Sequence, residues 1–216
     1  MKIKVEKLRK DFKNNTVLNN ITLNFESGKI YGLCGRNGSG KTVFLKLLCG
    51  LYMPSSGHVL YDDEEITLDN NYKFKIGALI ENPKFFNDLS GYDNLKVLVD
   101  IRKEIGKTEI LDSLKDVNLL PEKDKKFGKY SLGMKQKLGI AQVLMENPNV
   151  LILDEPFNGI ENMTVKKIKK ILLENKKNKK IIIISSHIKE DLNELCDQIF
   201  YFDNGNVFFN EKDIDE

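Results

Sequence analysis

GRNGSGKT, residues 35–42, follows the apolar run Ile30–Cys34 and precedes a helix-forming segment that begins at Val43. A strand, then G-x-x-x-x-G-K-T, then a helix is the context in which this pattern forms a phosphate-binding P-loop. The glycines let the backbone turn tightly, so that successive N–H groups converge on phosphate oxygens. The stretch therefore predicts an α/β fold built around a P-loop and a bound nucleoside triphosphate.

The groups of this loop have distinct expected roles. The N-terminus of the following helix adds partial positive charge beside the phosphates. Lys41 is expected to reach the β- and γ-phosphates, and the Thr42 hydroxyl is expected to bind Mg²⁺. The residues expected to contact the nucleotide here are Gly35, Asn37, Gly38, Ser39, Gly40, Lys41 and Thr42.

Two acidic residues follow a later apolar run. Val150–Leu153 is continuously apolar, and Asp154, Glu155 and Pro156 come directly after it. At the carboxyl end of a strand, Asp154 can hold Mg²⁺ through water, and Glu155 can orient and polarise the attacking water as general base. An apolar run ending in two acids is a weak signal alone. Together with a P-loop, it predicts nucleotide hydrolysis.

Composition is ordinary for a folded globular protein. The chain has 216 residues, of which 41% are hydrophobic and 31% charged, and its formal net charge is +2. This balance argues against a dedicated nucleic-acid-binding protein, which usually has a strongly basic face. The lysine clusters at 123–126 and 176–180 lie near acids or expected helix ends, so they are interpreted as solvated surface.

The sequence contains no signal-peptide pattern and no run of about 20 apolar residues. We therefore expect a cytoplasmic protein without direct membrane insertion, held at a membrane only through a partner. The three cysteines, Cys34, Cys49 and Cys196, lack metal-ligand spacing and are expected to be buried free thiols.

Hydrophobic periodicity predicts three parts within a single domain of residues 1–216. The first thirty residues alternate as strands do and predict a small antiparallel sheet. The residues expected on its buried face are Val17, Ile21, Leu23 and Phe25. Residues 83–146 show helical periodicity and predict an inserted α-helical subdomain. The apolar runs at 150–153 and 181–184 predict a parallel sheet covered on both faces.

Two further elements lie where ligands commonly bind in α/β folds. YSLGMKQK, residues 130–137, begins a helix expected to run to Glu146, with Ser131 as N-cap and free N–H groups directed outward. His187 follows the apolar run 181–184 and two serines, at the carboxyl end of a predicted parallel strand. A histidine at that edge is more typical of a site than of a turn.

In combination these motifs resemble those of the ATP-binding cassette (ABC) ATPases, over essentially the whole chain. YSLGMKQ is similar to the family's signature motif, and VLILDEP, residues 150–156, follows it as usual in the family. Asn158–Glu161 resembles the D-loop, His187 the switch histidine, and Phe12 the aromatic residue that stacks on adenine. The segment IGALIENPKFFNDLSGYDNL, residues 76–95, is similar to the Q-loop region.

The resemblance implies ATP as the nucleotide and a head-to-tail homodimer that encloses it. Ser131 and Gly133 of one chain would cover the ATP bound at residues 35–42 of the other. The residues expected to be catalytic are Glu155, His187 and Lys41. The residues expected at the metal site are Thr42, Asp154 and Glu81, the last in the place of the Q-loop glutamine.

The subgroup that the chain resembles most is the ATPase subunits of bacitracin and lantibiotic export and immunity transporters. This resemblance is carried mainly by IGALIE and SLGMKQ. It implies an ATPase that energises a separate integral-membrane permease at the inner face of the cell membrane. Pro83, Phe85, Phe86 and Tyr92 are candidates for the permease contact, and packing inside the helical insertion is the equal alternative.

Two other functions remain open from the sequence. A soluble ABC ATPase of iron–sulfur assembly or DNA repair would share every motif, although this sequence has neither a long coiled-coil insertion nor a duplicated cassette. A P-loop kinase acting on a small acceptor would have no use for the signature motif or the switch histidine.

The sequence departs from the family pattern at several positions. Leu132 and Met134 stand where the signature commonly has Gly and Gln, and Val43 replaces the usual second hydroxyl after the P-loop. Glu161 replaces the aspartate of the D-loop and is one methylene longer. None of these departures removes a group that hydrolysis is expected to require.

Overall fold

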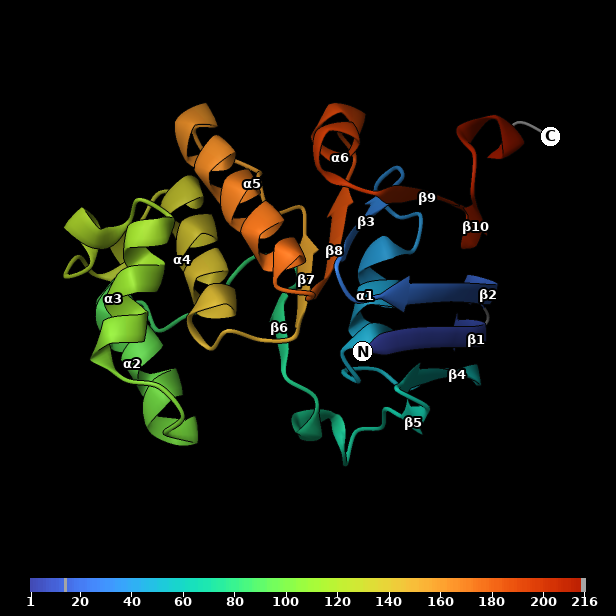
Figure 1. The fold of residues 1–216 in the computed structure, drawn as a ribbon, viewed down its shortest axis with the longest axis horizontal. Helices are drawn as coiled ribbons and strands as arrows, with labels where there is room; N and C mark the ends of the chain where they lie inside the picture. Colours follow the sequence, from blue (N-terminus) through green and yellow to red (C-terminus); the bar gives the residue numbers. More distant parts are fainter. Residues whose placement is uncertain (14, 215–216) are drawn as a thin grey trace.

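Two β-sheets lie beside a group of helices in the computed structural model, which describes residues 1–13 and 15–214 (Figure 1). The antiparallel sheet contains, in spatial order, β2 (Asn15–Glu26), β1 (Lys2–Phe12), β4 (Ser56–Tyr61) and β5 (Glu64–Glu65). The mainly parallel sheet contains, in order, β10 (Asn206–Phe208), β9 (Gln198–Asp203), β3 (Lys29–Cys34), β8 (Ile181–Ser186), β7 (Val150–Asp154) and β6 (Ile76–Leu79). Only β10 runs antiparallel to its neighbour in this second sheet. The predicted α/β class is confirmed.

Most helices lie between strands of the parallel sheet in the sequence. In chain order the helices are α1 (Lys41–Leu48), α2 (Gly91–Arg102), α3 (Lys107–Asp116), α4 (Leu132–Met145), α5 (Asn162–Lys177) and α6 (Lys189–Leu195). Helix α1 instead leads from β3 to the antiparallel strand β4. Short 3₁₀ turns lie at Asn71–Lys73, Leu120–Glu122, Phe127–Lys129 and Glu211–Ile214. No helix among residues 1–13 and 15–214 is both long enough and apolar enough to cross a bilayer.

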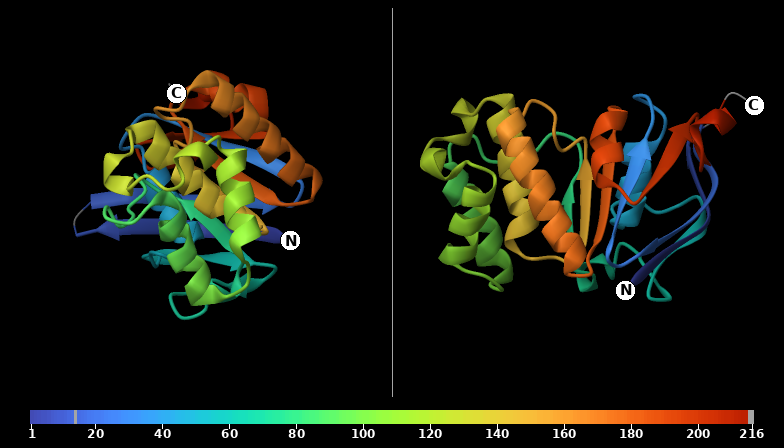
Figure 2. Two further views of the ribbon diagram at one scale, coloured as in Figure 1. Left: turned by 90° about the vertical axis from the view of Figure 1, so that its left-hand side faces the viewer. Right: turned by 45° about the horizontal axis from the view of Figure 1, so that its top comes forward.

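The parallel sheet separates two hydrophobic cores. Figure 2 shows α5 on one side of this sheet and α1 with the antiparallel sheet on the other. Residues 150–153 and 181–184 are fully buried, which confirms the predicted strands covered on both faces. Along β8, Ile181 and Ile183 face the core of α1, whereas Ile182 and Ile184 face α4 and α5.

The antiparallel sheet departs from the simple alternation predicted for it. Buried as predicted are Ile21, Leu23 and Phe25. The next buried residue is Leu18, whereas Val17 is only half-buried. Asn20 has φ +51°, and between Ile21 and Leu18 strand β2 contains one residue more than the β1 segment that it pairs with. This β-bulge reverses the alternation, so the prediction for Val17 was wrong.

The region predicted as a helical insertion contains α2, α3 and α4. Leu95, Leu114 and Leu138, one from each helix, are fully buried in one core. Phe85 and Tyr92 pack against this core, whereas Phe86 is 65% exposed. The boundaries of the insertion at 83 and 146 stay a prediction.

The three thiols lie in the cores or beside them. Cys34 and Cys49 are buried free thiols, as predicted, and Cys196 is half-buried rather than buried. Burial raises the pKa of the Cys49 and Cys196 thiols to about 12. Burial also raises the pKa of the Cys34 thiol, so all three thiols are neutral near pH 7.

Candidate active site

The P-loop turns tightly at the carboxyl edge of the parallel sheet, between β3 and α1. Gly38 and Gly40 have φ values of +84° and +105°, which favour glycine. A Cβ on Gly40 would lie 2.7 Å from the Leu18 side chain and 3.0 Å from the Val17 carbonyl oxygen. The bulged part of β2 therefore packs directly on the turn, and this contact leaves no room for a side chain at Gly40.

Lys41 begins α1 with its side chain inside the turn. It is 6% exposed, and its Nζ donates to the carbonyl oxygens of Gly35 at 2.7 Å and Arg36 at 3.0 Å. Burial lowers the pKa of Lys41, and the negative charges of Glu155 and Asp154 oppose this shift. The ammonium group is thus held where incoming phosphate oxygens can replace the two carbonyls as its acceptors.

Thr42 and Asp154 meet at the centre of the site although they are 112 residues apart. Thr42 Oγ1 donates to Asp154 Oδ2 at 2.8 Å. Asp154 is the last residue of β7 and is 6% exposed. Its second oxygen, Oδ1, accepts a hydrogen bond from the hydroxyl of Ser185 on β8. The structure therefore brings together two of the three residues predicted for the metal site.

Glu155 lies next to this pair in a conformation that is uncommon for a residue with a side chain, φ +47°. Its Oε2 lies 2.9 Å from His187 Nδ1, which joins two residues predicted to be catalytic. Its Oε1 is buried and has no hydrogen-bond partner in the part of the chain that the structure describes. Such an unsatisfied buried acceptor is a place for a ligand or a water.

Two cavities open on these residues. One, of about 320 Å³, is lined by Val17, Asn37, Gly38, Gly40, Lys41, Thr42, Val43, Asp154 and Glu155. The other, of about 790 Å³, extends from Gly35 and Asn37 past His187 to the β9–β10 hairpin. Most residues predicted for phosphate binding and catalysis thus line two cavities that share Asn37.

Glu81 forms an ion pair with Lys46, which lies on α1 one helical turn after Thr42. Its backbone has φ +61°, and its Oε1 accepts from Lys46 Nζ at 2.7 Å. Lys46 follows Thr42 by one turn, so both side chains lie on the same face of α1. The structure therefore pairs the Glu81 carboxylate with Lys46, and Glu81 is not among the residues that line the cavity of Thr42 and Asp154. Its role at the metal stays a prediction.

Phe12 is 40% exposed at the end of β1, where a base could stack on it. Its ring meets that of Tyr52 edge-on with centroids 5.7 Å apart. Two lysines lie over these rings: Lys10 Nζ is 4.9 Å from the Phe12 centroid, and Lys46 Nζ is 5.3 Å from that of Tyr52. Phe12, the residue predicted to stack on adenine, thus contacts Tyr52, and Tyr52 in turn contacts Lys46, the partner of Glu81.

The signature segment lies elsewhere on the chain. Ser131 is the N-cap of α4, as predicted, and its Oγ accepts from the Met134 N–H at 3.3 Å. A Cβ on Gly133 would lie 2.2 Å from the Gly159 carbonyl oxygen, so this glycine lets α4 pack directly on the D-loop. Neither Ser131 nor Gly133 is among the residues that line the two cavities.

The signature helix also holds the D-loop through charge. Lys137 Nζ and Thr164 Oγ1 each donate to Glu161 Oε1 at 2.7 Å. These bonds, first that from Lys137 and then that from Thr164, lower the pKa of Glu161 to about 2. In addition, Gln136 Nε2 donates to the backbone carbonyl oxygen of Glu155 at 3.0 Å. Two consecutive residues of α4 therefore bond to Glu155 and to the D-loop.

Residues 18–158 match the family model described as ABC transporter. The chain belongs to the ABC transporter family. It is 42% identical to the ABC transporter ATP-binding protein YybJ of Bacillus subtilis, over 97% of this chain and 96% of that protein. It is 39% identical to the bacitracin transport ATP-binding protein BcrA of Enterococcus faecalis, over 95% of this chain and 67% of that protein. It is 36% identical to the lantibiotic transport ATP-binding protein SrtF of Streptococcus pyogenes, over 99% of this chain and 91% of that protein.

Solved structures agree with this family. The dimeric bacterial ABC transporter cassette MJ0796 superposes with a TM-score of 0.87 at 26% identity, over 95% of this chain and 96% of the other. CbiO1 of Clostridium perfringens superposes with a TM-score of 0.79 at 30% identity, over 98% of this chain and 89% of the other. The predicted family is confirmed, and the chain is the ATP-binding subunit of an ABC transporter and an ABC ATPase.

Two residues of this ABC ATPase site were missed by sequence reasoning. Gln136 binds the Glu155 carbonyl oxygen from α4, and Ser185 binds both Asp154 and the Glu155 N–H from β8. Gln136 belongs to the quoted signature and carries no separate signal. Ser185 does carry one, because a polar residue directly continues the four isoleucines of β8.

Proposed function

We propose that this ABC ATPase hydrolyses Mg²⁺-ATP within a head-to-tail homodimer and energises a separate permease for antimicrobial peptides. The observation that carries the chemistry is the convergence of Thr42, Asp154, Glu155 and His187 at the edge where the P-loop turns. The names of BcrA and SrtF, bacitracin and lantibiotic transport proteins, support peptide transport.

The chemistry of the donor set fits Mg²⁺. Thr42 and Asp154 offer hard oxygen ligands in contact with one another, and Glu155 Oε1 is a further buried oxygen without a partner. Within the described ranges no group of three or more His, Cys, Asp or Glu side chains could enclose a metal ion. Mg²⁺ at nucleotide sites uses few protein ligands, because phosphate oxygens and water complete its shell. When bound, it would neutralise charge that develops on the phosphates.

Three residues of the chain would bind the phosphates and position the attacking water. Lys41 would exchange its two carbonyl acceptors for β- and γ-phosphate oxygens, with the P-loop N–H groups around it. Glu155 would accept a hydrogen bond from the attacking water and place it in line with the bond that breaks. His187 holds one oxygen of that carboxylate, so the other, Oε1, is the one free to face the water.

A second chain is part of the proposal because Ser131 and Gly133 line neither cavity of their own chain. Both belong to a helix start whose free N–H groups can bind an anion. A head-to-tail partner would bring this helix start to the γ-phosphate. The dimeric state of the MJ0796 cassette supports this arrangement.

The permease would contact the surface near Phe86. This side chain is 65% exposed, whereas Phe85 and Tyr92 are packed against the helical core and are less available. The Asn94 side chain binds the backbone N–H and carbonyl oxygen of Phe86, at 2.9 Å and 3.1 Å, and so fixes the loop that presents it. The exposed Phe86 side chain, on a backbone held by Asn94, would thus be the main aromatic group in the permease contact.

Co-expression with a candidate permease tests the coupling. The chain should fractionate with membranes when a neighbouring reading frame that encodes about six hydrophobic spans is co-expressed, and not without it. Phe86→Ala should reduce the recovered complex while Mg²⁺-dependent hydrolysis by the isolated chain persists. Equal membrane recovery with and without the integral protein would contradict this part of the proposal.

Glu81→Gln should change turnover by less than about tenfold, roughly 1.4 kcal/mol, because an amide oxygen can take the place of the carboxylate oxygen. The Mg²⁺ concentration at half-maximal activity should shift, since a negative charge near the phosphates is lost. Lys46→Met removes the cation that pairs with the Glu81 carboxylate. This variant should shift the Mg²⁺ concentration at half-maximal activity in the opposite direction. Mg²⁺ titrations at fixed ATP measure these shifts, and identical curves for wild type and both variants would place Glu81 outside the metal site.

A further inference from the structure

Ser185 is a polar residue that directly follows the four isoleucines of β8 in the parallel sheet. It is fully buried and follows Ile181 and Ile183 on the face of β8 that is directed toward α1. A branched apolar side chain would continue that face and bury more hydrocarbon. A buried hydroxyl is costly in free energy unless it is hydrogen-bonded, so the contacts of this serine decide what it does.

The hydroxyl of Ser185 bonds to both acidic residues of the adjacent strand. Its Oγ donates to Asp154 Oδ1 and accepts from the Glu155 N–H at 3.1 Å. The Ser185 carbonyl oxygen accepts from the same N–H at 3.2 Å. Ser185 is also the register partner of Asp154 in the parallel pairing of β7 with β8. The two strands therefore fix the position of the hydroxyl.

These bonds restrict both acids. Asp154 has a donor on each carboxylate oxygen, Thr42 on one and Ser185 on the other, so rotation of the carboxylate about its Cβ–Cγ bond is limited. The bond to the Glu155 N–H holds the backbone at the point where φ becomes +47° and the chain leaves the strand. From this conformation the Glu155 side chain reaches His187.

We infer that Ser185 is a positioning residue that orients Asp154 for metal binding and Glu155 for catalysis. This inference rests on the proposed function. The serine itself would touch neither nucleotide nor metal; it would act through the two residues that do. A residue that only filled space in β8 could be replaced by alanine at a cost in stability and with no change in metal affinity.

The test compares Ser185→Ala with Ser185→Cys and with Ser113→Ala. Cysteine is similar in size to serine but is a weak donor, so it separates the hydrogen bonds from the volume of the side chain. Ser113 is a buried serine of α3 whose hydroxyl donates to the Ile110 carbonyl oxygen, away from the site. Its replacement by alanine removes a buried hydroxyl without touching either acid.

Mn²⁺ binding in the presence of a non-hydrolysable ATP analogue, followed by electron paramagnetic resonance, gives a readout independent of turnover. Ser185→Ala should weaken Mn²⁺ binding about tenfold and lower kcat by a similar factor, because hydrogen bonds to charged groups are among the stronger ones. Affinity for the analogue without metal should stay within about twofold of wild type, since the P-loop is untouched. Ser185→Cys should fall between serine and alanine, and Ser113→Ala should match wild type.

Wild-type Mn²⁺ binding and kcat in a folded Ser185→Ala variant would overturn the inference. If Ser185→Ala does not fold, Ser185→Cys decides in the same way, because a cysteine variant with wild-type metal binding and turnover would show that the hydroxyl is not needed. Should the wild type bind metal and nucleotide without hydrolysing ATP, the proposed function fails while the metal-binding comparison still tests Ser185.

Discussion

Glu155→Gln is expected to lower the rate of ATP hydrolysis by at least about a hundredfold, while the affinity for ATP stays near that of the wild type. The amide keeps the length and shape of the side chain but cannot accept a proton from water. It can still hold His187, because Glu155 Oε2 lies 2.9 Å from the His187 ring nitrogen and an amide oxygen can accept the same hydrogen bond. Steady-state phosphate release and equilibrium binding of a fluorescent ATP analogue measure the two quantities separately.

The same variant should accumulate as an ATP-dependent dimer. If ATP closes two chains together and hydrolysis ends that state, a chain that binds ATP without cleaving it remains closed. Size-exclusion chromatography with and without Mg²⁺-ATP reports the change. Strictly monomeric elution at high protein and ATP concentration would contradict the head-to-tail dimer. Glu146→Gln is a matched control, because it neutralises an acid that pairs with Arg102 at the C-terminal end of α4, and it should hydrolyse ATP and elute like the wild type.

The central part of this site could be predicted because short-range sequence rules determine it. The P-loop needs only a strand, a glycine-rich turn and a helix, all within about twenty residues. Asp154 and Glu155 end an apolar strand, and parallel strands place their carboxyl ends at one edge of the sheet. Topology then brings Thr42 to Asp154 without further information.

The features that could not be predicted depend on contacts between distant segments. The bulge at Asn20 moves Leu18 into the core and Val17 to the P-loop cavity, and no local pattern in β2 marks the extra residue. The pairing of Glu81 with Lys46 likewise joins residues 35 positions apart, from the segment after β6 and from α1. The double contact of Ser185 requires the register of β7 with β8, which is set by the whole sheet.

Lys41→Met is expected to weaken ATP binding at least about a hundredfold, or some 2.7 kcal/mol, because the β- and γ-phosphates lose their buried cation. Methionine keeps most of the hydrocarbon of the side chain, so the variant should fold. Its stability without nucleotide should not fall greatly: burial lowers the pKa of Lys41, which means that the folded protein disfavours the charge. Isothermal titration with ATP and thermal melting measure the two effects.

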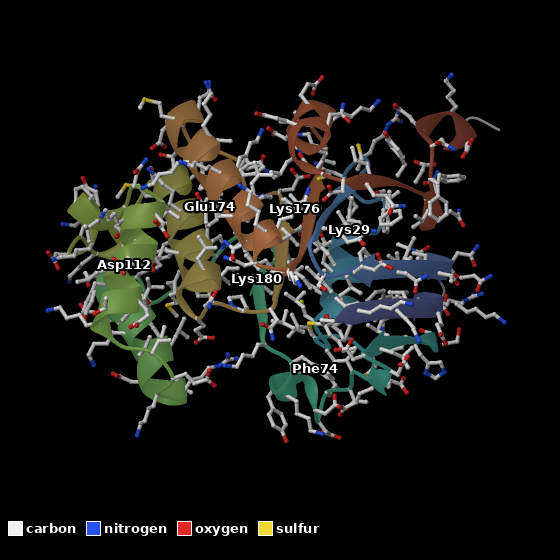
Figure 3. All side chains as sticks on the ribbon, viewed as in Figure 1. Lys29, Phe74, Asp112, Glu174, Lys176 and Lys180 are labelled. Atoms are coloured by element: carbon white, nitrogen blue, oxygen red, sulfur yellow. The ribbon has the colours of Figure 1, made fainter. Side chains whose placement is uncertain are left out.

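Lys180→Met separates loss of a site cation from loss of any buried lysine. Lys180 is 8% exposed, burial lowers its pKa as it does that of Lys41, and its Nζ donates to Asn147 Oδ1. It lies beside the C-terminal end of α5, where β8 begins, whereas the P-loop lies at the carboxyl end of β3 (Figure 3). Its replacement should leave ATP affinity unchanged. Near-normal affinity and turnover in Lys41→Met would show that this loop does not bind the triphosphate, and equal losses in both variants would show that the effect is one of folding.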